Sequence, residues 1–475
     1  MRVLLALALA AALASETQIP ERDLAIAAAL RDQALAGSSA YALAESLVRE
    51  VGHRLAGSDN DARGVEWALR TMERLGFDRV WTEPVEYPVW SREREEAEVL
   101  APEPLPLAIA ALGGSVPTPP EGLIGEIVAF ADFAELRAAA QGSLKGKIAF
   151  VTRRMERARD GSGYGPVVAA RVAGASVAAE KGAIAFLMRS AGTRDSDRPH
   201  TGNLRYGESI TRIPAAALAN AHADRLQALL AEGPVTVRLR IAARERGLYQ
   251  GANVIGELSG RMQPEEVVAL GAHLDSWDLG EGAIDDAAGV GIVLAAAELI
   301  AKQPERPRRS IRVVLFAAEE IGLYGARAYA ERHREAVARH VLVGESDFGG
   351  GRIYQLDAAV KPEARAAIAQ MHKVLEPLGI ALGREDAGGG PDFGPLRRLG
   401  AAAVDLRQDG TYYFDYHHTV DDTLDKLVPG DLDQNVAAWA ALAWLAANAE
   451  GDFGSGSLPE RAGPPMIQEA RPAPP

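Results

Sequence analysis

Cysteine is absent from the 475-residue sequence. Disulfide bonds are therefore excluded, and so is lipid attachment at a signal-peptide junction, which requires a cysteine. The stability of the folded chain must then come from packing and from any metal that it binds. A hydrophobic content of 48% over this length is sufficient for two to three domains with full cores.

Clusters of basic residues are also lacking. The chain carries 51 lysine and arginine residues against 65 aspartate and glutamate residues, which gives a net charge of -14. Proteins that bind nucleic acids need a basic face, and no long run of lysine or arginine supplies one. We therefore expect no nucleic-acid partner.

One long apolar run lies at the N-terminus. The run from Val3 to Ala12 follows Arg2 and ends in Ala12-Leu13-Ala14. A positive residue, a short apolar segment and small residues before a cleavage point are typical of a secretory signal peptide, with an alanine-rich first helix as the alternative. We predict a signal peptide over residues 1–14, no membrane span, and an exported protein that is periplasmic or secreted.

What the sequence does contain is a set of histidine and carboxylate side chains that follow short apolar runs. The run Glu266–Leu270 is rich in apolar residues, bounded by polar ones, and precedes His273. Such a run is typical of a buried strand, and open α/β sheets bind ligands at the carboxyl edge of their strands. Two further runs, Ile311–Phe316 and Val341–Val343, also lead into acidic residues. The candidate ligands lie in five places: His273, Asp285-Asp286, Glu319-Glu320, Glu345–Asp347 and His417-His418.

The mixture of imidazole and carboxylate ligands favours zinc over magnesium. Magnesium prefers shells made only of oxygen, with several waters retained, whereas zinc accepts both kinds of ligand. Five candidate ligands exceed the need of one tetrahedral ion, and the Asp285 carboxylate could bridge two ions about 3.5 to 4 Å apart. The expected cofactor is therefore two Zn²⁺ ions per subunit.

The same residues carry a resemblance to a known family. The motifs, in family order, are His273–Asp278, Asp285-Asp286 with Gly289, Glu319-Glu320, Glu345–Asp347, and His417-His418-Thr419 with Asp422-Thr423. On these motifs the chain resembles the M28 family of zinc peptidases, and within it the carboxypeptidase Q branch. The resemblance implies an α/β fold, a mixed-sheet α/β/α sandwich of the zinc-exopeptidase type with an inserted protease-associated domain. It also implies a homodimer.

The resemblance further implies how the ligands divide between two metals. His273 and Asp347 would hold one ion. Glu320 and His418 would hold the other, and Asp285 would bridge the two. His418 is favoured over the adjacent histidine because the family places its ligand directly before Thr or Ser.

Two more residues receive catalytic roles from the resemblance. Glu319 would be the general base that takes a proton from the metal-bound water and later delivers it to the leaving amine. Asp275 would accept the second ring N–H of His273 and fix its tautomer. For Glu319 and Glu320 the alternative is a solvated helix start, where acidic side chains meet the helix dipole favourably.

Candidate substrate contacts lie in two loops. They are Asp392, Arg407, Tyr413, Tyr416 and His417. Asp392 lies in a segment that resembles the family's loop near the substrate amine, with a simple turn as the alternative. One arginine among tyrosines could hold a free α-carboxylate, which the resemblance to the carboxypeptidase Q branch favours.

The order of patterns along the chain predicts a split catalytic domain. Proline, glycine and small residues replace the helical pattern between Pro102 and Glu121. We predict a catalytic domain over residues 15–115 and 247–450, an inserted protease-associated domain over residues 116–246, and a disordered tail over residues 451–475. In the insert, His200 either reaches over the active site or belongs to a structural turn. Short strands are expected at Arg79–Trp81, Val85–Tyr87, Val235–Ile241 and Asn253–Leu258.

The resulting interpretation is a di-zinc exopeptidase acting on short peptides. It would hydrolyse dipeptides or remove N-terminal residues by attack of metal-bound hydroxide, with Glu319 as the general base. A general aminopeptidase on longer peptides, a single-zinc glutaminyl-cyclase-like enzyme and a non-catalytic binding module on a peptidase scaffold are the alternatives. The complete ligand set counts against the last two.

Overall fold

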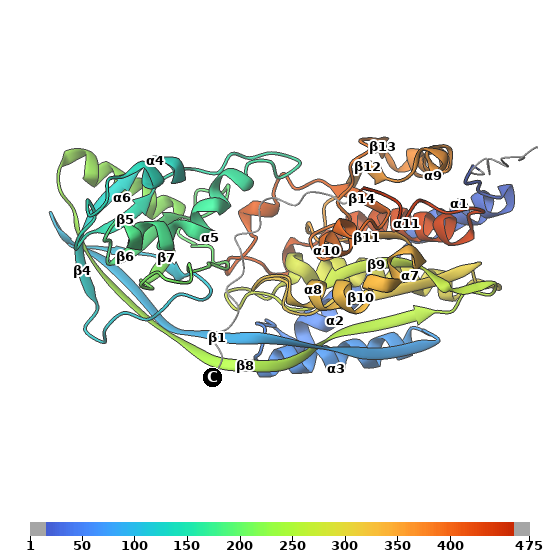
Figure 1. The fold of residues 1–475 in the computed structure, drawn as a ribbon, viewed down its shortest axis with the longest axis horizontal. Coiled ribbons are helices and arrows are strands. Elements are labelled where there is room, and N and C mark those ends of the chain that lie inside the picture. The colour runs from blue at the N-terminus through green and yellow to red at the C-terminus, as the bar shows by residue number, and fades with distance from the viewer. Residues whose placement is uncertain (1–15, 460–475) are drawn as a thin grey trace, which may run out of the picture.

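The computed structural model describes residues 16–459. The predicted signal peptide, residues 1–14, lies outside this range, as do residues 460–475 of the predicted tail. The chain forms two lobes joined by two long antiparallel strands (Figure 1). We call residues 102–235 the second lobe, and the rest of the described chain apart from the two long strands the main lobe.

The main lobe contains most of the helices. They are α1 (Glu21–Leu35), α2 (Ala40–Val51), α3 (Asp59–Arg74), α7 (Ala288–Ala301), α8 (Tyr324–Arg332), α9 (Arg365–Leu375), α10 (Gly394–Arg398) and α11 (Pro429–Asn448). Its strands are β9 (Gln263–His273), β10 (Arg309–Phe316), β11 (His340–Glu345), β12 (Ile353–Ala359), β13 (Ala381–Leu382) and β14 (Ala403–Gln408). Short segments of π-helix or 3₁₀-helix are η1 (Ala283–Ala287), η2 (Arg334–Arg339), η3 (Pro362–Ala364), η4 (Glu376–Leu378), η5 (Tyr413–Asp415) and η6 (Leu424–Lys426). The two long connecting strands are β1 (Arg79–Ala101) and β8 (Thr236–Leu258).

The main sheet is mixed and is covered by helices on both faces. Its strands lie in the order β13-β12-β14-β11-β9-β10-β8-β1, with β9, β10 and β11 parallel and β8 antiparallel to β10. One face packs on α7 and α11, which α1 and α2 cover in turn, and Leu270 and Trp439 share the hydrophobic core there. The other face packs on α8 and α10, where Ala269 and Tyr329 share a second core. This arrangement confirms the predicted α/β/α sandwich, and it explains why β9 is apolar without alternation from Val267 onward.

The second lobe extends the same sheet. Its elements are β2 (Leu105–Leu107), β3 (Ile109–Ala111), β4 (Leu123–Phe130), β5 (Ile148–Val151), β6 (Ala185–Arg189), β7 (Ala215–Leu218), α4 (Phe133–Ala138), α5 (Gly165–Glu180) and α6 (Asn220–Glu232). Strands β4 to β7 are parallel, and β4 pairs with β8. Helix α5 crosses close to β6, because Gly174 leaves room for the ring of Phe186.

The boundaries of the lobes differ from the predicted ones. The second lobe begins before residue 116, because β3 pairs with β7. The predicted boundary at 246/247 falls inside β8, and each pair of short strands expected around the boundaries is one continuous strand of 23 residues. At the other end, Phe453 is fully buried, so the packed chain continues past the predicted start of the tail at residue 451.

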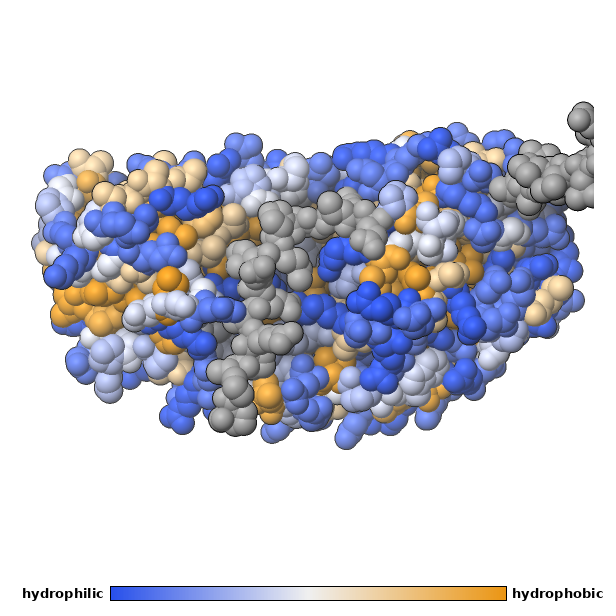
Figure 2. Space-filling model, viewed as in Figure 1, coloured by the Kyte–Doolittle hydropathy of each residue, from blue (hydrophilic) through white to orange (hydrophobic). Residues whose placement is uncertain are grey.

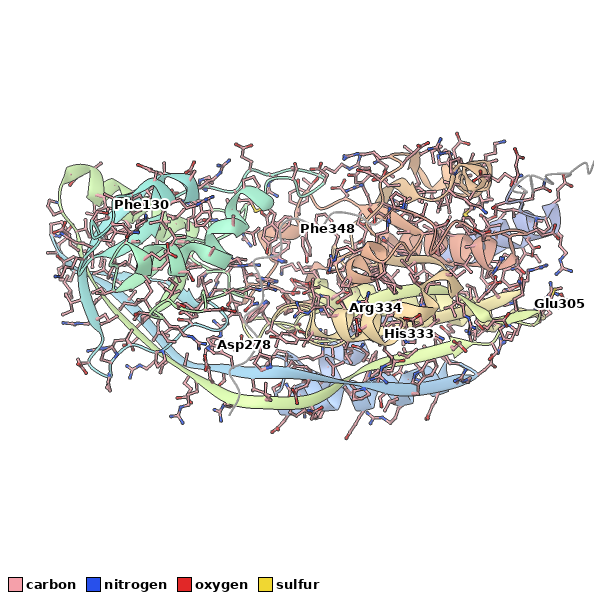
Figure 3. All side chains as sticks on the ribbon, viewed as in Figure 1. Phe130, Asp278, Glu305, His333, Arg334 and Phe348 are labelled. Atoms are coloured by element: carbon pink, nitrogen blue, oxygen red, sulfur yellow. The ribbon has the colours of Figure 1, made fainter. Side chains whose placement is uncertain are left out.

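The junction of the lobes is tied together by Arg92 of β1. Its Nε donates to both carboxylate oxygens of Asp278, at 3.0 and 2.9 Å, and its Nη2 donates to the hydroxyl of Thr201 in the second lobe at 2.8 Å. Asp278 and Phe348 both lie where the two lobes meet (Figure 3). The face shown in Figure 2 is largely hydrophilic, with hydrophobic groups on both lobes. Within residues 16–459, no helix combines the length and apolar character needed to cross a membrane.

Candidate metal centre

The predicted ligands gather at the carboxyl edge of the main sheet. In the parallel pair β9 and β10, Phe316 lies opposite His273, and in the pair β11 and β9, Glu345 lies opposite Gly271. The three strands therefore end side by side. His273 at the end of β9, the turn after β10 and Asp347 just after β11 are brought together by this register.

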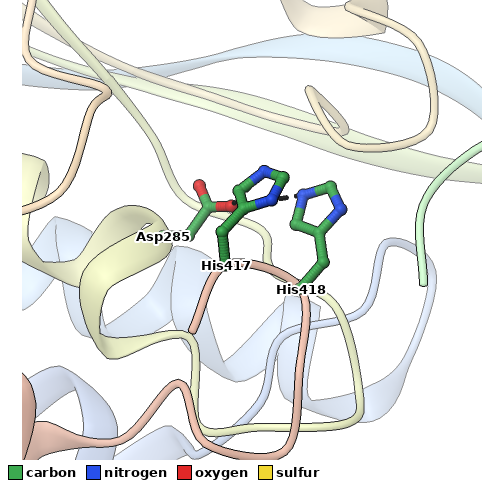
Figure 4. A group of neighbouring side chains, drawn as sticks. All are labelled: Asp285, His417 and His418. Atoms are coloured by element: carbon green, nitrogen blue, oxygen red, sulfur yellow. Dashed lines mark ion pairs between the residues drawn. The ribbon is translucent and has the colours of Figure 1, made fainter. Parts of the chain in front are cut away.

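Asp285 stands between two groups of ligand atoms. Its Oδ1 lies 3.1 Å from Nε2 of His273, and that same Nε2 lies 3.5 Å from Oδ1 of Asp347. Its Oδ2 lies 3.2 Å from Nε2 of His418 and 3.4 Å from Nε2 of His417 (Figure 4). Asp285 thus presents one oxygen to each group, as a bridging carboxylate does.

Glu320 belongs to the group on the His418 side. Its Oε2 lies 2.9 Å from Nε2 of His418, while its Oε1 is buried and has no hydrogen-bond partner. Burial raises the pKa of Glu320, and the Asp285 carboxylate adds to this shift against the opposing effect of His418. A buried carboxylate oxygen without a partner is costly unless a cation satisfies it.

The donor set fits zinc. Among the described residues, two groups of three ligand atoms lie within 4.8 Å of one another: His273 with Asp285 and Asp347, and Asp285 with His417 and His418. Imidazole nitrogen and carboxylate oxygen are both good zinc ligands, and a shared carboxylate suits a two-metal site. The residues present therefore fit the zinc expected from the sequence.

The ring of His418 is oriented by the second lobe. Its Nδ1 donates to the carbonyl oxygen of Thr201 at 3.2 Å, which turns Nε2 towards Asp285 and Glu320. The backbone N–H of Thr201 donates in return to the carbonyl oxygen of His418 at 2.9 Å. Metal-binding histidines are commonly fixed in this way through the second ring nitrogen.

His273 is fixed in the same manner, but not by the group expected from the sequence. Its Nδ1 donates to the backbone carbonyl of Asp275 at 3.0 Å, whereas the carboxylate Oδ1 of Asp275 lies 3.7 Å away. That carboxylate instead accepts the N–H of Glu319 at 2.9 Å and the N–H of Glu320 at 3.3 Å. The side chain of Asp275 therefore holds the Glu319-Glu320 turn, and its predicted contact with the His273 ring is corrected.

Glu319 lies beside the ligands without joining either group of ligand atoms. Burial raises its pKa well above the usual value, and the carboxylates of Asp347 and Glu320 add to the shift against the effect of His273. A carboxylate next to the metal ligands, but left free by them, has the position required of a base that transfers protons.

Two carboxylates hold the backbone on either side of Asp285. Asp422 accepts the N–H groups of Ala283 at 2.8 Å and Ile284 at 2.7 Å. Asp286 accepts the N–H of His273 at 3.2 Å and the N–H of Gly289 at 3.0 Å, so it caps α7 and braces the end of β9 together. Both side chains fix the bridging residue without touching the ligand atoms themselves.

Arg54 braces the loop that joins the first two ligands, and the sequence did not reveal it. The side chain is fully buried. Its guanidinium donates to four carbonyl oxygens: Leu274 at 2.7 Å, Gly52 at 2.8 Å, Gly282 at 2.8 Å and Glu281 at 3.1 Å. Because the carbonyls of Leu274, Glu281 and Gly282 lie towards the two ends of the segment between His273 and Asp285, Arg54 holds that loop in place. No local pattern marks this residue, since three of its four partners lie more than 200 positions away.

Asp392 lies at the sheet edge against Glu345. Its N–H donates to Oε2 of Glu345 at 2.7 Å, and both of its carboxylate oxygens are buried without a hydrogen-bond partner. Burial raises the pKa of Asp392 well above its usual value, and the nearby charges of Glu345 and Glu319 add to the shift. The structure therefore places Asp392 beside Glu345 at the sheet edge, and its contact with substrate stays a prediction.

The other predicted substrate residues divide into two sets. The ring of Tyr413 lies 4.9 Å from that of His417, and both Tyr413 and Tyr416 line a cavity of about 490 Å³ that reaches Ile284, next to Asp285. Arg407 is not brought to the metal ligands. Its Nε is paired with the buried carboxylate of Asp357, on strands β14 and β12.

The second lobe contributes three side chains that the sequence did not identify as a set. Tyr164 packs edge-on against His417, with ring centroids 5.4 Å apart. Arg171 donates to the Tyr164 hydroxyl at 2.6 Å. His200 is fully buried, and the residue that follows it, Thr201, bonds to His418. Of the two alternatives for the His200 loop, the structure favours the one that reaches over the metal centre.

Comparison with known proteins agrees with this geometry. The model of peptidase family M28 matches residues 253–443. Carboxypeptidase Q from Xenopus laevis is 34% identical over 404 residues, which cover 85% of this chain and 84% of the relative. The chain belongs to peptidase family M28. Carboxypeptidase Q from Homo sapiens is similar to this M28 peptidase at 33% identity over 405 residues, with the same coverage.

Solved structures lead to the same family. A crystal structure of a peptidase M28 precursor from Shewanella amazonensis SB2B is 47% identical, with a TM-score of 0.91, and covers 93% of this chain and 100% of its own. A zinc aminopeptidase from Bacillus subtilis shares the fold, with 20% identity, a TM-score of 0.60, and coverage of 87% of this chain and 98% of its own. This M28 peptidase is therefore a metallo-exopeptidase with a zinc-aminopeptidase fold.

Proposed function

We propose that this M28 peptidase is a di-zinc exopeptidase that hydrolyses dipeptides or removes N-terminal residues from short peptides. The observation that carries the proposal is the position of Asp285, with one oxygen beside His273 and the other beside His418. Asp347 and Glu320 complete the two sides. One shared carboxylate between two sets of ligands supports two ions rather than one.

The zinc ions, when bound, would lower the pKa of a water molecule and polarise the scissile carbonyl. The chain's own contribution to proton transfer is Glu319, whose carboxylate takes a proton from the attacking water and delivers it to the nitrogen of the leaving amine. The C–N bond of the peptide breaks as the new C–O bond is completed, and no residue forms a covalent bond with the substrate. Asp275 supports this step by holding the backbone N–H groups of Glu319 and Glu320.

Three further proposals follow from the sequence. The pattern of residues 1–14 supports export to the periplasm or the medium. The resemblance supports assignment of the second lobe as a protease-associated domain, and it supports a homodimer. The retained ligands and the free base Glu319 favour an enzyme over a binding module built on the same scaffold.

Hydrolysis of a peptide panel by the zinc-loaded protein tests the function. The panel contains unblocked dipeptides, N-acetylated dipeptides and longer peptides, and metal analysis gives the zinc content of each variant. Glu319→Gln is expected to retain zinc and lose at least about 10²-fold in kcat. Glu331→Gln, on the surface of α8, is the matched control and keeps full activity.

Each outcome distinguishes between two assignments of substrate, metal content or general base. Preference for unblocked dipeptides supports a dipeptidase, while equal turnover of longer peptides makes the protein a general aminopeptidase. A zinc content near two per chain supports the shared Asp285 site, and a content near one contradicts it. A Glu319→Gln variant with undiminished kcat would overturn the assignment of Glu319 as the general base.

A further inference from the structure

Arg171, on helix α5 of the second lobe, is a buried cation with an incomplete set of partners. The residue is 8% exposed. Its Nη1 donates to the Tyr164 hydroxyl, and its Nε has no hydrogen-bond partner. Gly202 lies against the guanidinium, since a Cβ at that position would stand 2.4 Å from Nη1. Among the described residues, the structure records no ion pair between Arg171 and a carboxylate.

His200, on the neighbouring loop, is a second buried donor that lacks a hydrogen-bond partner. Its Nδ1 accepts the backbone N–H of Ala191 at 3.0 Å, so the ring proton lies on Nε2. That Nε2 is buried and has no hydrogen-bond partner. Burial lowers the pKa of His200 well below its usual value, with added effects from Arg171 and His418, so the ring is neutral and Nε2 acts as a donor.

Both side chains lie next to the metal centre. Arg171 bonds to Tyr164, whose ring packs edge-on against His417 at 5.4 Å between centroids. His200 precedes Thr201, whose carbonyl accepts from Nδ1 of His418 at 3.2 Å. The second lobe thus brings a guanidinium and an imidazole N–H close to the His417-His418 side of the site.

Unsatisfied buried donors indicate a missing acceptor. A donor without a partner loses the hydrogen bonds that water would give it, and this cost is larger for a charged group. Two such donors, one of them cationic, fit an anion with more than one acceptor oxygen. A carboxylate meets this requirement.

The proposed reaction supplies such a carboxylate at a suitable distance. In a dipeptide, the C-terminal carboxylate lies one residue beyond the scissile carbonyl, and one residue spans at most about 3.3 to 3.6 Å. A group that binds this carboxylate must therefore stand very close to the metal ligands. Arg407, the arginine expected from the sequence, is instead paired with the buried carboxylate of Asp357.

We propose that Arg171 and His200 of the second lobe bind the free C-terminal carboxylate of a dipeptide substrate and so restrict the enzyme to substrates that end there. The inference rests on the proposed function. It gives the second lobe a direct part in substrate selection. It also explains why an arginine is suited to this position, since the guanidinium can offer two parallel N–H groups to one carboxylate.

The test compares a dipeptide with its C-terminal amide, for example Ala-Ala and Ala-Ala-amide. Arg171→Gln is expected to lower kcat/KM for the dipeptide about 10- to 100-fold and to leave the amide within about threefold. Arg171→Lys should recover part of the loss. Arg225→Gln, at an exposed position on α6 of the same lobe, is the matched control and changes neither substrate.

A binding measurement gives a readout that does not depend on turnover. Titration calorimetry in the Glu319→Gln background should show the dissociation constant for Ala-Ala rising about 10- to 100-fold when Arg171→Gln is added, with that for the amide unchanged. If Arg171→Gln does not fold, His200→Leu replaces it, with an expected loss of about 3- to 10-fold for the dipeptide alone.

The outcomes keep the inference apart from the proposed function. Equal losses for dipeptide and amide, or no loss for either, overturn the carboxylate site while the peptidase function stands. A wild-type enzyme that cleaves the amide as efficiently as the dipeptide would also overturn the carboxylate site while the peptidase function stands. If the wild type cleaves neither and the Glu319→Gln variant binds neither, the proposed function fails, and the carboxylate site fails with it.

Discussion

Thr201 and His418 lie more than 200 residues apart in the chain and exchange two hydrogen bonds. The N–H of Thr201 donates to the carbonyl oxygen of His418 at 2.9 Å, and Nδ1 of His418 donates to the carbonyl oxygen of Thr201 at 3.2 Å. The first residue belongs to the second lobe and the second to the metal centre. Docking of the second lobe and orientation of a metal ligand are therefore coupled.

This coupling predicts that zinc protects the Thr201 amide from hydrogen exchange. Metal bound at Nε2 of His418 would fix the ring and with it the pair of hydrogen bonds, because a ligand stabilises the state that binds it. Removal of zinc by a chelator should speed exchange at Thr201 at least about tenfold. The amide of Ile127, which bonds to Val235 within the second lobe, is the control. Equal exchange at Thr201 with and without zinc would show that the coupling is absent.

Arg54→Ala is expected to destabilise the fold strongly. The change leaves four carbonyl oxygens without their donor, and each buried unsatisfied group costs about 1 to 3 kcal/mol. The free energy of unfolding should fall by at least about 3 kcal/mol in denaturant titrations. Arg70→Ala, at an exposed helix position, should change it by less than about 0.5 kcal/mol. A similar effect for both variants would contradict the bracing role of Arg54.

Arg407→Ala is expected to affect stability rather than catalysis. Burial acts to raise the pKa of Asp357, but hydrogen bonds from the Arg384 backbone and from Arg407 outweigh it and lower the pKa. A carboxyl with a lowered folded-state pKa adds stability above its unfolded pKa, and this stability is lost as pH falls through the folded-state pKa. At pH 7 the variant should lose about 1 to 3 kcal/mol of unfolding free energy and keep kcat/KM for dipeptides within about twofold. A tenfold loss of kcat/KM with unchanged stability would instead place Arg407 in contact with substrate.

Because His340 is buried, the protein is expected to lose stability in mild acid. Burial lowers its pKa to about 3, and the positive charges of Arg312 and His333 add to the shift. The unfolded chain takes up this proton below a pKa of about 6.5, whereas the folded chain does not, so stability falls as pH drops below about 6.5. Between pH 7 and pH 5 this group accounts for about 2 kcal/mol of unfolding free energy.

The measurement for His340 is denaturant unfolding of the wild type and His340→Gln at both pH values. The variant should lose about 2 kcal/mol less than the wild type between pH 7 and pH 5, whatever its stability at pH 7. Other histidines titrate in both proteins, so the difference isolates His340. Parallel pH dependences in the two proteins would show that His340 is protonated in the folded state.

The strands that carry the ligands were predictable from the sequence, while the two longest strands were not. Strands β9, β10 and β11 are buried on both faces, so each is a short apolar run with polar residues at its end. Strand β1 lacks such a run, because it passes between the lobes and is exposed over part of its length. It also contains Pro84 and Pro88, which are tolerated because β1 lies at an edge of the sheet and pairs with β8 along that stretch.

The roles of the site residues were also predictable only in part. Asp275 was identified as a residue of the site, but the group that its carboxylate holds was not. Two positions after His273, the backbone carbonyl of Asp275 reaches the ring first, and the side chain turns to the N–H groups of Glu319 and Glu320. Sequence spacing places the residue near the metal but does not say which of its oxygens faces the histidine.

The sequence by itself determined the ligand types, their order and their place at strand ends, because these depend on local apolar runs and on the residues that follow them. Only the tertiary structure decided that Arg54 braces the ligand loop, that Thr201 orients His418, and that Arg171 rather than Arg407 stands near the centre. The physical reason is that each of these contacts joins segments that are distant in the chain or belong to different lobes. Such contacts arise from how distant segments and the two lobes pack together, and that packing leaves no periodic mark on the sequence around either partner.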